Sequence, residues 1–329
     1  MRARILAVVL AILASSCSSP IATPAASSTA TAASPATSPV STLAAAGWRR
    51  IADIPTPRSE VAATVFRGNV YVIGGFGGGN VVEIFDGQRW TRAPDLPIAV
   101  DHAMAAAVDD GAGSAGVYVF GGNAPSPVAR AFRLSPGGDA WREIAPMPGP
   151  RSQAAAVARA SSIHIVGGYD GQRLVAPTYA YEASADRWRT VATIPTPRDH
   201  LAAAPIGAGV CAIGGRRLSL TTNLATLECY DPAADRWEKL PDAPTARGGV
   251  GAAAVGDRLV LVGGEQPSGT FKEVEIFDPA TGRWSRGPDL PTPRHGIGVV
   301  SVRDTVFVMS GGPTPGGSQT AVCEALELR

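Results

Sequence analysis

Ionisable side chains recur in this sequence at regular distances from paired glycines. Five arginines lie 16 or 17 residues before a Gly-Gly pair: Arg58, Arg151, Arg198, Arg247 and Arg294. Glu60 follows the first arginine by two residues, and Asp101-His102 and Asp199-His200 occupy matching places in later stretches. Guanidinium groups bind carboxylates and sulfates through paired hydrogen bonds, and imidazoles beside carboxylates transfer protons or bind metals. Which chemistry applies depends on the elements that bring these residues together.

The chain contains six copies of one pattern. A Gly-Gly pair closes an apolar run at residues 74–75, 121–122, 167–168, 214–215, 263–264 and 311–312, and Trp recurs at positions 48, 90, 141, 188, 237 and 284. A second apolar run and a turn, such as "EIFDGQRW", lie between each Gly-Gly and the next Trp, and small residues such as 202–204 come after it. Each copy therefore predicts four short strands, which bury their faces only by stacking on neighbouring copies.

These repeats predict an all-β, six-bladed propeller. The doubled glycine, the Tyr-Asp or Phe-Asp turn and the spaced Trp resemble the kelch repeat, and the resemblance covers about residues 46–329. It implies a kelch-type β-propeller with four antiparallel strands per blade. Trp48 precedes the first Gly-Gly, while the sixth copy ends without a Trp strand. We therefore expect the N-terminal strand near Trp48 to complete the last blade and close the ring.

Composition and charge agree with this fold class. The 38 Gly, 28 Pro and 17% charged residues suit a turn-rich all-β protein. The net charge of +1 gives no indication of nucleic-acid binding. The glycines of "VYVIGGFGGG" precede "NVVEIFD", which predicts a strand, whereas a phosphate-binding loop requires a helix at that point. These glycines are therefore interpreted as part of the repeat.

The first 17 residues predict an export signal. Arg2 and Arg4 precede an apolar run at residues 5–14 that is too short to span a bilayer. Ser16-Cys17 resembles the cleavage and acylation site of bacterial lipoproteins, which implies a lipid on Cys17. The alternative is an ordinary secretory signal in which Cys17 has no role.

Residues 18–45 predict a disordered tether of Ala, Ser, Thr and Pro. They contain no charged and no aromatic residue, so they bury too little surface to fold. We therefore expect residues 46–329 to lie outside the cytoplasm, either anchored to the membrane by a lipid on Cys17 or secreted if Cys17 is not acylated.

Kelch propellers typically bind ligands at one mouth of the ring, between the loops that enter the inner strands and those that follow Gly-Gly. Two positions after each arginine, or after Val100 in the second copy, the repeats differ and carry Glu60, His102, Gln153, His200, Gly249 and Gly296. The candidate ligand-binding residues are Gln153, His295 and the five arginines. Alternatively, each arginine bonds carbonyls or an acid of the neighbouring blade, and recurrence in almost every copy favours this structural role. The sixth copy has the longer spacing because Ser310 reads as an insertion.

The favoured function is a binding module without catalysis or cofactor. We expect a monomer whose partner is an envelope protein, a glycan or a sugar acid. The alternative is a mutarotase or epimerase, by resemblance to a six-bladed sialic-acid mutarotase. Ring opening needs a proton donor and an acceptor beside an arginine that holds the substrate carboxylate. Glu60, His102 or His200, with Arg58 or Arg198, fit these roles.

Two kinds of metal site are disfavoured. A galactose-oxidase-like copper site requires a Cys joined to a Tyr, and no Cys is placed to cross-link Tyr169. A metal shared by His102, His200 and His295 requires three blades to place ligands about 2 Å from one ion. The offset of His295 by one position argues against that arrangement, so we expect no metal.

Two cysteines are candidates for a disulfide. Cys211 and Cys229 lie on the second and third strands of the fourth repeat, symmetrically about residue 220 in the hairpin between them. They can therefore face each other across two antiparallel strands, and an oxidising compartment permits the bond. The alternative is two buried thiols. Cys323 has no evident partner in the sequence.

Overall fold

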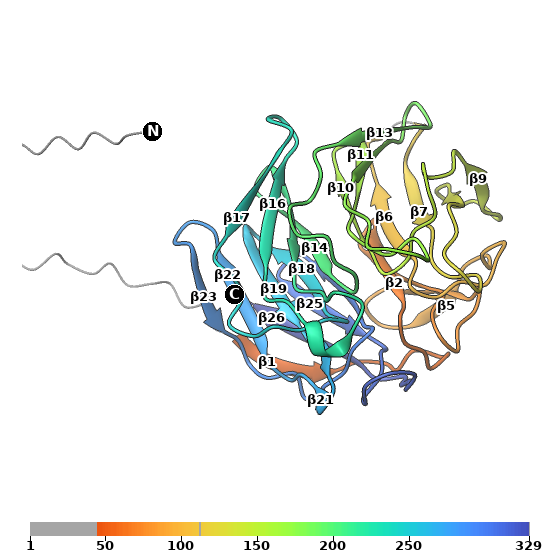
Figure 1. Cartoon of the computed structure of the whole chain (residues 1–329). Coiled ribbons are helices and arrows are strands. Elements are labelled where there is room, and N and C mark those ends of the chain that lie inside the picture. The colour runs from red at the N-terminus through yellow and green to blue at the C-terminus, as the bar shows by residue number, and fades with distance from the viewer. Residues whose placement is uncertain (1–44, 112, 329) are drawn as a thin grey trace, which may run out of the picture. The chain divides into compact units, whose positions relative to one another are not determined.

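The computed structural model describes residues 45–111 and 113–328, which form a six-bladed β-propeller (Figure 1). Each blade is a four-stranded antiparallel sheet, so the predicted fold class is confirmed. Within the described residues, helical structure is limited to a 3₁₀ turn at Leu220–Thr222, and no helix there is long and apolar enough to cross a membrane. The predicted signal, Cys17 and residues 18–44 of the tether lie outside this range.

The strands of each blade follow one another from the centre of the ring outward. Blades 1 and 2 consist of β2 (Ala62–Phe66), β3 (Asn69–Ile73), β4 (Val82–Phe85) and β5 (Trp90–Arg92), and of β6 (Met104–Val108), β7 (Gly116–Phe120), β8 (Ala131–Leu134) and β9 (Arg142–Ile144). Blades 3 and 4 consist of β10 (Ala155–Arg159), β11 (Ser162–Val166), β12 (Thr178–Glu182) and β13 (Arg187–Val191), and of β14 (Ala202–Ile206), β15 (Gly209–Ile213), β16 (Leu227–Asp231) and β17 (Arg236–Leu240).

Blade 5 consists of β18 (Gly251–Val255), β19 (Arg258–Val262), β22 (Val274–Asp278) and β23 (Arg283–Arg286), with a small hairpin of β20 (Glu265–Gln266) and β21 (Gly269–Thr270). Blade 6 is completed by the N-terminal strand. Its strands are β24 (Gly298–Val302), β25 (Thr305–Met309), β26 (Cys323–Leu328) and β1 (Ala45–Arg50). Trp48 pairs with Leu326 in this outer strand, so the predicted closure is confirmed.

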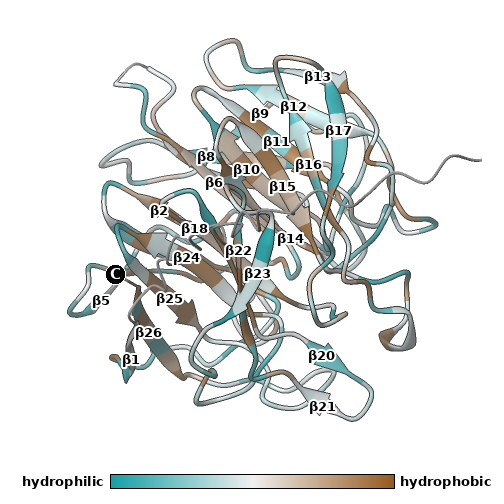
Figure 2. Cartoon of the chain, turned by 90° about the vertical axis from the view of Figure 1, so that its left-hand side faces the viewer, coloured by the Kyte–Doolittle hydropathy of each residue, from teal (hydrophilic) through white to brown (hydrophobic). Residues whose placement is uncertain are grey.

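Small side chains line the centre of the ring, as the repeats predict. The inner strands enclose a channel of about 240 Å³, lined mainly by Ala and Val together with Thr64, Pro205 and Ser301. Hydropathy differs between the layers of a blade: the inner strand β10 and the second strand β15 are largely apolar, whereas the outer strands β17 and β23 are polar (Figure 2). Only residues with small side chains fit where six sheets converge.

Each repeated Trp links its blade to the preceding one. The indole N–H of every Trp donates a hydrogen bond of 2.8–3.0 Å to a backbone carbonyl just after the outer strand of the preceding blade. The acceptors, in the order of the Trp residues, are Pro288, Ala52, Pro94, Ala145, Ala192 and Pro241. Phe85, Tyr181, Tyr230 and Phe277 of the third strands pack against the Trp of their own blade. The Trp residues therefore fill the outer gaps and satisfy carbonyl groups there.

The five repeated arginines lie inside the blades. Their residues are 0% exposed, and those of blades 1, 4, 5 and 6 form ion pairs of 2.5–2.7 Å with a glutamate on the third strand of the same blade, namely Glu83, Glu228, Glu275 and Glu324. A threonine hydroxyl also donates to each glutamate, from Thr56, Thr196, Thr245 and Thr292. The acid thus belongs to the arginine's own blade, not to the neighbouring blade.

The backbone at the arginine position also joins two blades. Its carbonyl accepts a hydrogen bond of 2.8–3.0 Å from the second residue of the glycine pair in the preceding blade, and Val100 does the same in blade 2. The guanidinium of Arg58 meanwhile donates to the carbonyls of Val72 and Val81 in its own blade. One residue therefore fixes both the interior of its blade and the contact with the blade before it.

Blades 2 and 3 show how this arrangement varies. In blade 2, Val100 and Phe132 replace the arginine and the glutamate and belong to one apolar cluster, with Ile98 at the threonine position. In blade 3, the guanidinium of Arg151 lies 4.2 Å from the centre of the Tyr179 ring, which occupies the glutamate position. In blade 2 both members of the pair are apolar, and in blade 3 the arginine packs on an aromatic ring in place of a glutamate. Each buried guanidinium therefore has a partner suited to its charge.

Two details of the sequence interpretation concern blades 4 and 6. Ser310 is not an insertion: it takes the place of the first glycine of the pair, with φ +61°, and Gly311 takes the second. Arg294 donates to the Ser310 carbonyl 16 residues away, the same spacing as in the other blades. Cys211 and Cys229 form the expected disulfide between β15 and β16, and Cys323 is a buried free thiol.

Removal of one buried guanidinium is expected to destabilise the propeller strongly. Arg198→Ala leaves Glu228 buried without its partner, and breaking a buried pair in this way costs about 3–5 kcal/mol. The triple variant T196I/R198V/E228F copies blade 2 and is expected to recover most of that loss. Urea unfolding measures each free energy. Arg92→Ala, which breaks the exposed pair with Asp95, is the control with a small effect. Equal losses in R198A and R92A would contradict the structural role.

Candidate functional site

The mouth of the ring is built from equivalent residues of the six blades. In each blade, the residue after the buried arginine, or after Val100, forms a β-bridge with the residue that follows the glycine pair. These pairs are Ser59–Phe76, Asp101–Asn123, Ser152–Tyr169, Asp199–Arg216, Gly248–Glu265 and His295–Gly312. Because the bridge fixes the backbone of both loops, the side chains differ between blades without a change in the frame.

The next residue of each blade forms an inner ring. Glu60, His102, Gln153, His200, Gly249 and Gly296 all adopt left-handed backbone conformations, with φ between +51° and +64°. In blades 2 to 6 the backbone amide of this residue donates to the carbonyl of its equivalent in the preceding blade, at 2.8–3.1 Å. In blade 1 the amide of Val61, not that of Glu60, donates to the Gly296 carbonyl at 3.4 Å and completes the circle. Left-handed φ costs a non-glycine residue about 1–2 kcal/mol. Four of the six residues at this position are not glycine and therefore bear this cost.

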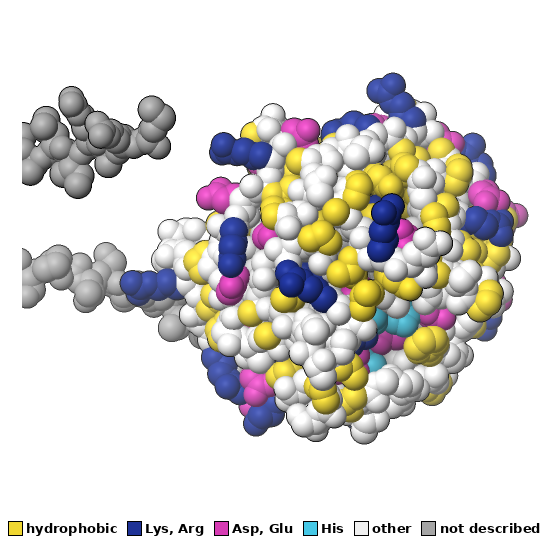
Figure 3. Space-filling model, viewed as in Figure 1, with side chains coloured by type: hydrophobic (Ala, Val, Ile, Leu, Met, Phe, Trp, Pro, Cys, Tyr) yellow, Lys and Arg dark blue, Asp and Glu magenta, His cyan; other side chains and the backbone are white. Residues whose placement is uncertain are grey.

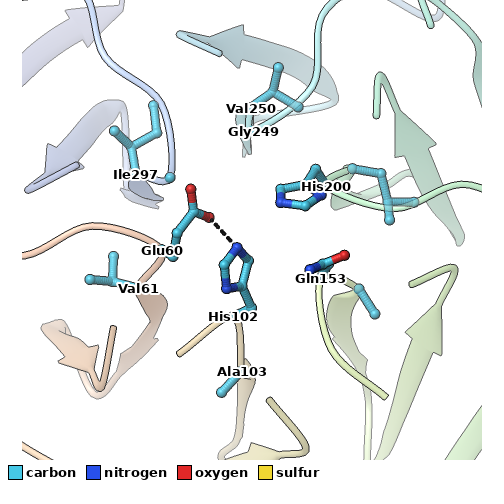
Figure 4. Close-up of a pocket in the computed structure, with 12 residues that line it drawn as sticks. Glu60, Val61, His102, Ala103, Gln153, His200, Gly249, Val250 and Ile297 are labelled. Atoms are coloured by element: carbon cyan, nitrogen blue, oxygen red, sulfur yellow. Dashed lines mark ion pairs between the residues drawn. The ribbon is translucent and has the colours of Figure 1, made fainter. Parts of the chain in front are cut away.

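These residues form a polar bowl at the mouth. A cavity of about 520 Å³ is lined by Glu60, Phe76, His102, Gln153, Tyr169, Asp199, His200, Arg216, Leu218, Glu265, His295, Gly316 and Gly317. The space-filling view shows histidine and acidic side chains together in a hollow of the face shown (Figure 3). The close-up shows Glu60, His102, Gln153 and His200 pointing toward one another from separate blades (Figure 4).

His102 lies between two carboxylates. Its Nδ1 is 2.6 Å from Asp101 Oδ1, and its Nε2 is 3.2 Å from Glu60 Oε2. Asn123 also donates to Asp101 Oδ1 and fixes that carboxylate. Burial favours the neutral imidazole, but the charges of Glu60 and Asp101 outweigh it and raise the pKa of His102 to about 9. His102 is therefore a cation at neutral pH in this arrangement.

His200 has a similar carboxylate but a different second neighbour. Its Nδ1 is 2.6 Å from Asp199 Oδ2, while Arg216 approaches its Nε2 at 2.8 Å. Burial and the Arg216 guanidinium lower the pKa of His200 despite the opposing effect of Asp199. His200 thus donates to Asp199 through Nδ1 and accepts from Arg216 through Nε2. The rings of His102 and His200 lie edge to face, with centroids 5.1 Å apart.

Glu60 joins the two sides of the bowl. Its Oε1 lies 3.0 Å from His295 Nδ1 while its Oε2 contacts His102. Burial opposes ionisation, but His102, His295 and His200 together hold the pKa of the Glu60 carboxyl well below its usual value. Glu265 forms a further contact, because its Oε1 accepts from Arg216 at 2.7 Å. Because His295 Nδ1 also lies 3.6 Å from Glu265 Oε2, a continuous polar network spans five blades, all except blade 3.

The structure divides the residues proposed from the sequence. Glu60, His102 and His200, together with Gln153 and His295, line the bowl. The proposal that the five arginines bind ligand at the mouth is wrong for this structure, because their guanidinium groups are buried inside the blades. His164, the remaining histidine, is buried in β11 beside Tyr230, and burial lowers its pKa to about 4.

Arg216 and Glu265 line the bowl but were not among the residues proposed from the sequence. Both follow the glycine pair directly, at the position where other blades carry Phe76, Asn123 and Tyr169. Variation among repeats at this position would have identified them, since the same criterion selected Glu60, His102 and His200. Three positions in each repeat thus supply most of the bowl.

Comparisons with known proteins agree with the repeats. Residues 101–312 match the family model of the KLHDC2/KLHL20/DRC7 Kelch-repeats domain, and residues 57–97 match the Kelch motif. Kelch-like protein 35 of Mus musculus is 31% identical over 129 residues, which are 37% of this chain and 21% of that protein. Beta-scruin of Limulus polyphemus is 29% identical over 141 residues, which are 39% of this chain and 15% of that protein. The chain thus spans about a fifth or less of these relatives' lengths.

A solved structure also shares the architecture. The structure of YjhT aligns with a TM-score of 0.73 at 15% sequence identity and covers 85% of this chain and 99% of that chain. At this identity the likeness supports the six-bladed fold and says nothing of the ligand.

The inner ring predicts unequal effects for two equivalent glycines. A Cβ at Gly296 lies 2.7 Å from the Glu60 amide nitrogen and 2.5 Å from its carboxylate, whereas a Cβ at Gly249 meets nothing closer than 3.3 Å. Gly296→Ala and Gly249→Ala share the cost of a left-handed alanine, about 1–2 kcal/mol. We expect G296A to lose at least about 1 kcal/mol more, because Glu60 must move. Urea unfolding of both variants measures the difference, and equal losses would contradict the tight contact.

Proposed function

Because this chain belongs to the kelch-repeat family, we propose that the mouth of its propeller binds a small, hydroxyl-rich ligand of the carbohydrate class. The convergence of charged and polar side chains from separate blades in one bowl carries this proposal. The cavity of about 520 Å³ lies within the usual range for small-molecule sites. It accommodates a compact ligand such as one or two sugar rings.

The chemistry of the bowl suits a sugar or sugar acid. Glu60, Glu265 and Gln153 offer acceptors for hydroxyl groups, and Arg216 offers a guanidinium. Phe76 is 37% exposed and contacts the His102 ring, which gives the rim an apolar face of the kind that packs against a sugar ring. Arg216, which lines the bowl, binds the carboxylate of a sugar acid in place of the buried Arg58 or Arg198. A polar ligand with few apolar groups fits this set of side chains.

We further propose that the propeller acts outside the cytoplasm as a monomer, tethered by residues 18–45 to a lipid on Cys17. The disulfide between Cys211 and Cys229 supports an oxidising compartment. The expected ligand then comes from the cell envelope, as a glycan or sugar acid. An envelope protein is the other partner class, and it would bind over the same rim.

A thermal-shift screen of the full chain tests ligand binding. The screen contains neutral sugars, sugar acids, cell-wall fragments and short peptides, in the presence of a chelator. We expect a sugar or sugar acid to raise the Tm. At a ligand concentration of 100 times the Kd, binding adds about 2.7 kcal/mol to the free energy of unfolding. Glu60→Gln and Arg216→Ala should abolish the shift, whereas Arg217→Ala, an exposed neighbour, should retain it. A shift that survives both E60Q and R216A would place binding elsewhere, and the absence of any shift would reject a small ligand.

Catalysis of sugar-acid mutarotation is the second candidate function. The observation that favours it is the pair of adjacent imidazoles, with centroids 5.1 Å apart in the same bowl as Arg216, which could donate and accept protons at neighbouring atoms of a sugar acid. A galactose-oxidase-like copper enzyme has no such support. Tyr169 donates to Gly171, and the described cysteines lie in the disulfide of blade 4 and in blade 6.

Anomer exchange measured by NMR separates catalysis from binding. A mutarotase accelerates the exchange of a sugar acid that binds in the screen, and His102→Gln or His200→Gln lowers that rate by about 10²–10⁴. Gln is chosen because Gln153 already occupies the equivalent left-handed position in blade 3. If saturating protein leaves the exchange rate of a bound sugar acid unchanged, the function is binding alone.

A further inference from the structure

Three side chains of the inner ring converge on one point. Glu60, His102 and His200 each offer a ligand atom, and these atoms all lie within 4.8 Å of one another. Glu60 Oε2 and His102 Nε2 are 3.2 Å apart. Two ligands about 2 Å from a common ion are separated by roughly 3–4 Å, so this spacing requires little movement to bind one ion. In Figure 4 the three side chains point into the same space.

A second observation concerns the outer nitrogens of both histidines. Asp101 and Asp199 each lie 2.6 Å from the Nδ1 of the next residue, which leaves both Nε2 atoms directed inward. Asn123 and the backbone amide of Leu218 fix the two carboxylates in turn. A metal-binding histidine almost always donates its other N–H to a carboxylate or carbonyl, which orients the ring and strengthens the ligand. Both histidines have this arrangement.

The charge around this point also favours a cation. Four carboxylates surround it, those of Glu60, Asp101, Asp199 and Glu265, and Arg216 contributes one guanidinium. We propose that Glu60 and the Nε2 atoms of His102 and His200 bind one divalent transition-metal ion at the base of the bowl, and that the ion takes the place of the Nε2 proton of His102, which is released to solvent. Two imidazoles and one carboxylate suit Zn²⁺ and its first-row neighbours better than Mg²⁺ or Ca²⁺.

This proposal replaces the expectation of no metal. That expectation required His295 as the third ligand, and its offset by one position counted against convergence. The structure supplies Glu60 at the ring position instead, while His295 contacts the other oxygen of the same carboxylate. His295 with Glu60 and Glu265 forms a second possible cluster, so the two sets must be separated by experiment.

Arg216 determines access to the ion. Its NH2 group lies 2.8 Å from His200 Nε2, where it occupies the lone pair that a metal requires. The same guanidinium is bonded to Glu265 and lies 3.7 Å from Asp199, so these carboxylates hold it when it withdraws from the imidazole. Arg216 therefore competes with the metal, although it is expected to support an anionic ligand.

Metal titration tests the site without any organic ligand. The untagged full chain is treated with a chelator, dialysed and titrated with Zn²⁺ by calorimetry and with Co²⁺ by visible absorption. We expect one equivalent to bind, with affinity at least about 10-fold weaker in His102→Gln and His200→Gln. His295→Gln removes a neighbour of Glu60 that lies outside the proposed trio, and it should weaken binding less than His102→Gln or His200→Gln does. Asp101→Asn should weaken it by about 10- to 100-fold through the orientation of His102.

The Arg216→Ala variant gives the sharper test. It should bind Zn²⁺ more tightly than the unaltered chain, while the same variant loses the sugar-dependent Tm shift. No stoichiometric binding by the unaltered chain, equal loss in H295Q and H102Q, or weaker binding in R216A would each overturn the proposal. The unfolding midpoint of every variant in urea shows whether it is folded. The metal site goes beyond the proposed ligand function, and each can fail while the other stands.

Discussion

In four of the six blades, a buried arginine paired with a glutamate fixes the loop that forms the mouth. The guanidinium bonds carbonyls and a carboxylate inside its own blade, while its backbone carbonyl accepts from the preceding blade. The two residues that follow are therefore fixed at the mouth, one in a β-bridge and one in the inner ring. Every side chain proposed to bind a ligand or a metal lies at one of these two positions or directly after a glycine pair.

This arrangement separates what holds the scaffold from what lines the bowl. In blade 2 an apolar Val100–Phe132 pair replaces the ion pair, yet Asp101 and His102 keep the same backbone positions as their equivalents in blade 4. A buried ion pair and a well-packed apolar pair can be similar in stability. The mouth therefore depends on the presence of a matched pair, not on its charge.

The sequence was sufficient for the fold and for part of the site. The spacing of Gly-Gly and Trp predicted six blades and the closing strand, because each signal recurs six times. Spacing alone could not show that Arg58 points into its blade, since this depends on Glu83 on a strand that is distant in sequence. Comparison of the third strands would have shown the match, because Glu83, Glu228, Glu275 and Glu324 occur in the four repeats that carry Thr-x-Arg before the inner strand. The sequence could not predict that Glu60, His102 and His200 converge, because this depends on the radius of the inner ring. The spacing of the repeats gives no distance between blades.

Closure of the ring has a consequence for how the chain is made. β1 precedes all other strands of the propeller in the chain, and its partner β26 follows them. β1 therefore has no partner until β26 has been synthesised. Glu60 meets His295 and Gly296 across the same seam between blades 1 and 6. Contacts this distant in sequence form slowly and late. A chain truncated before His295 therefore has neither a sealed ring nor a complete bowl.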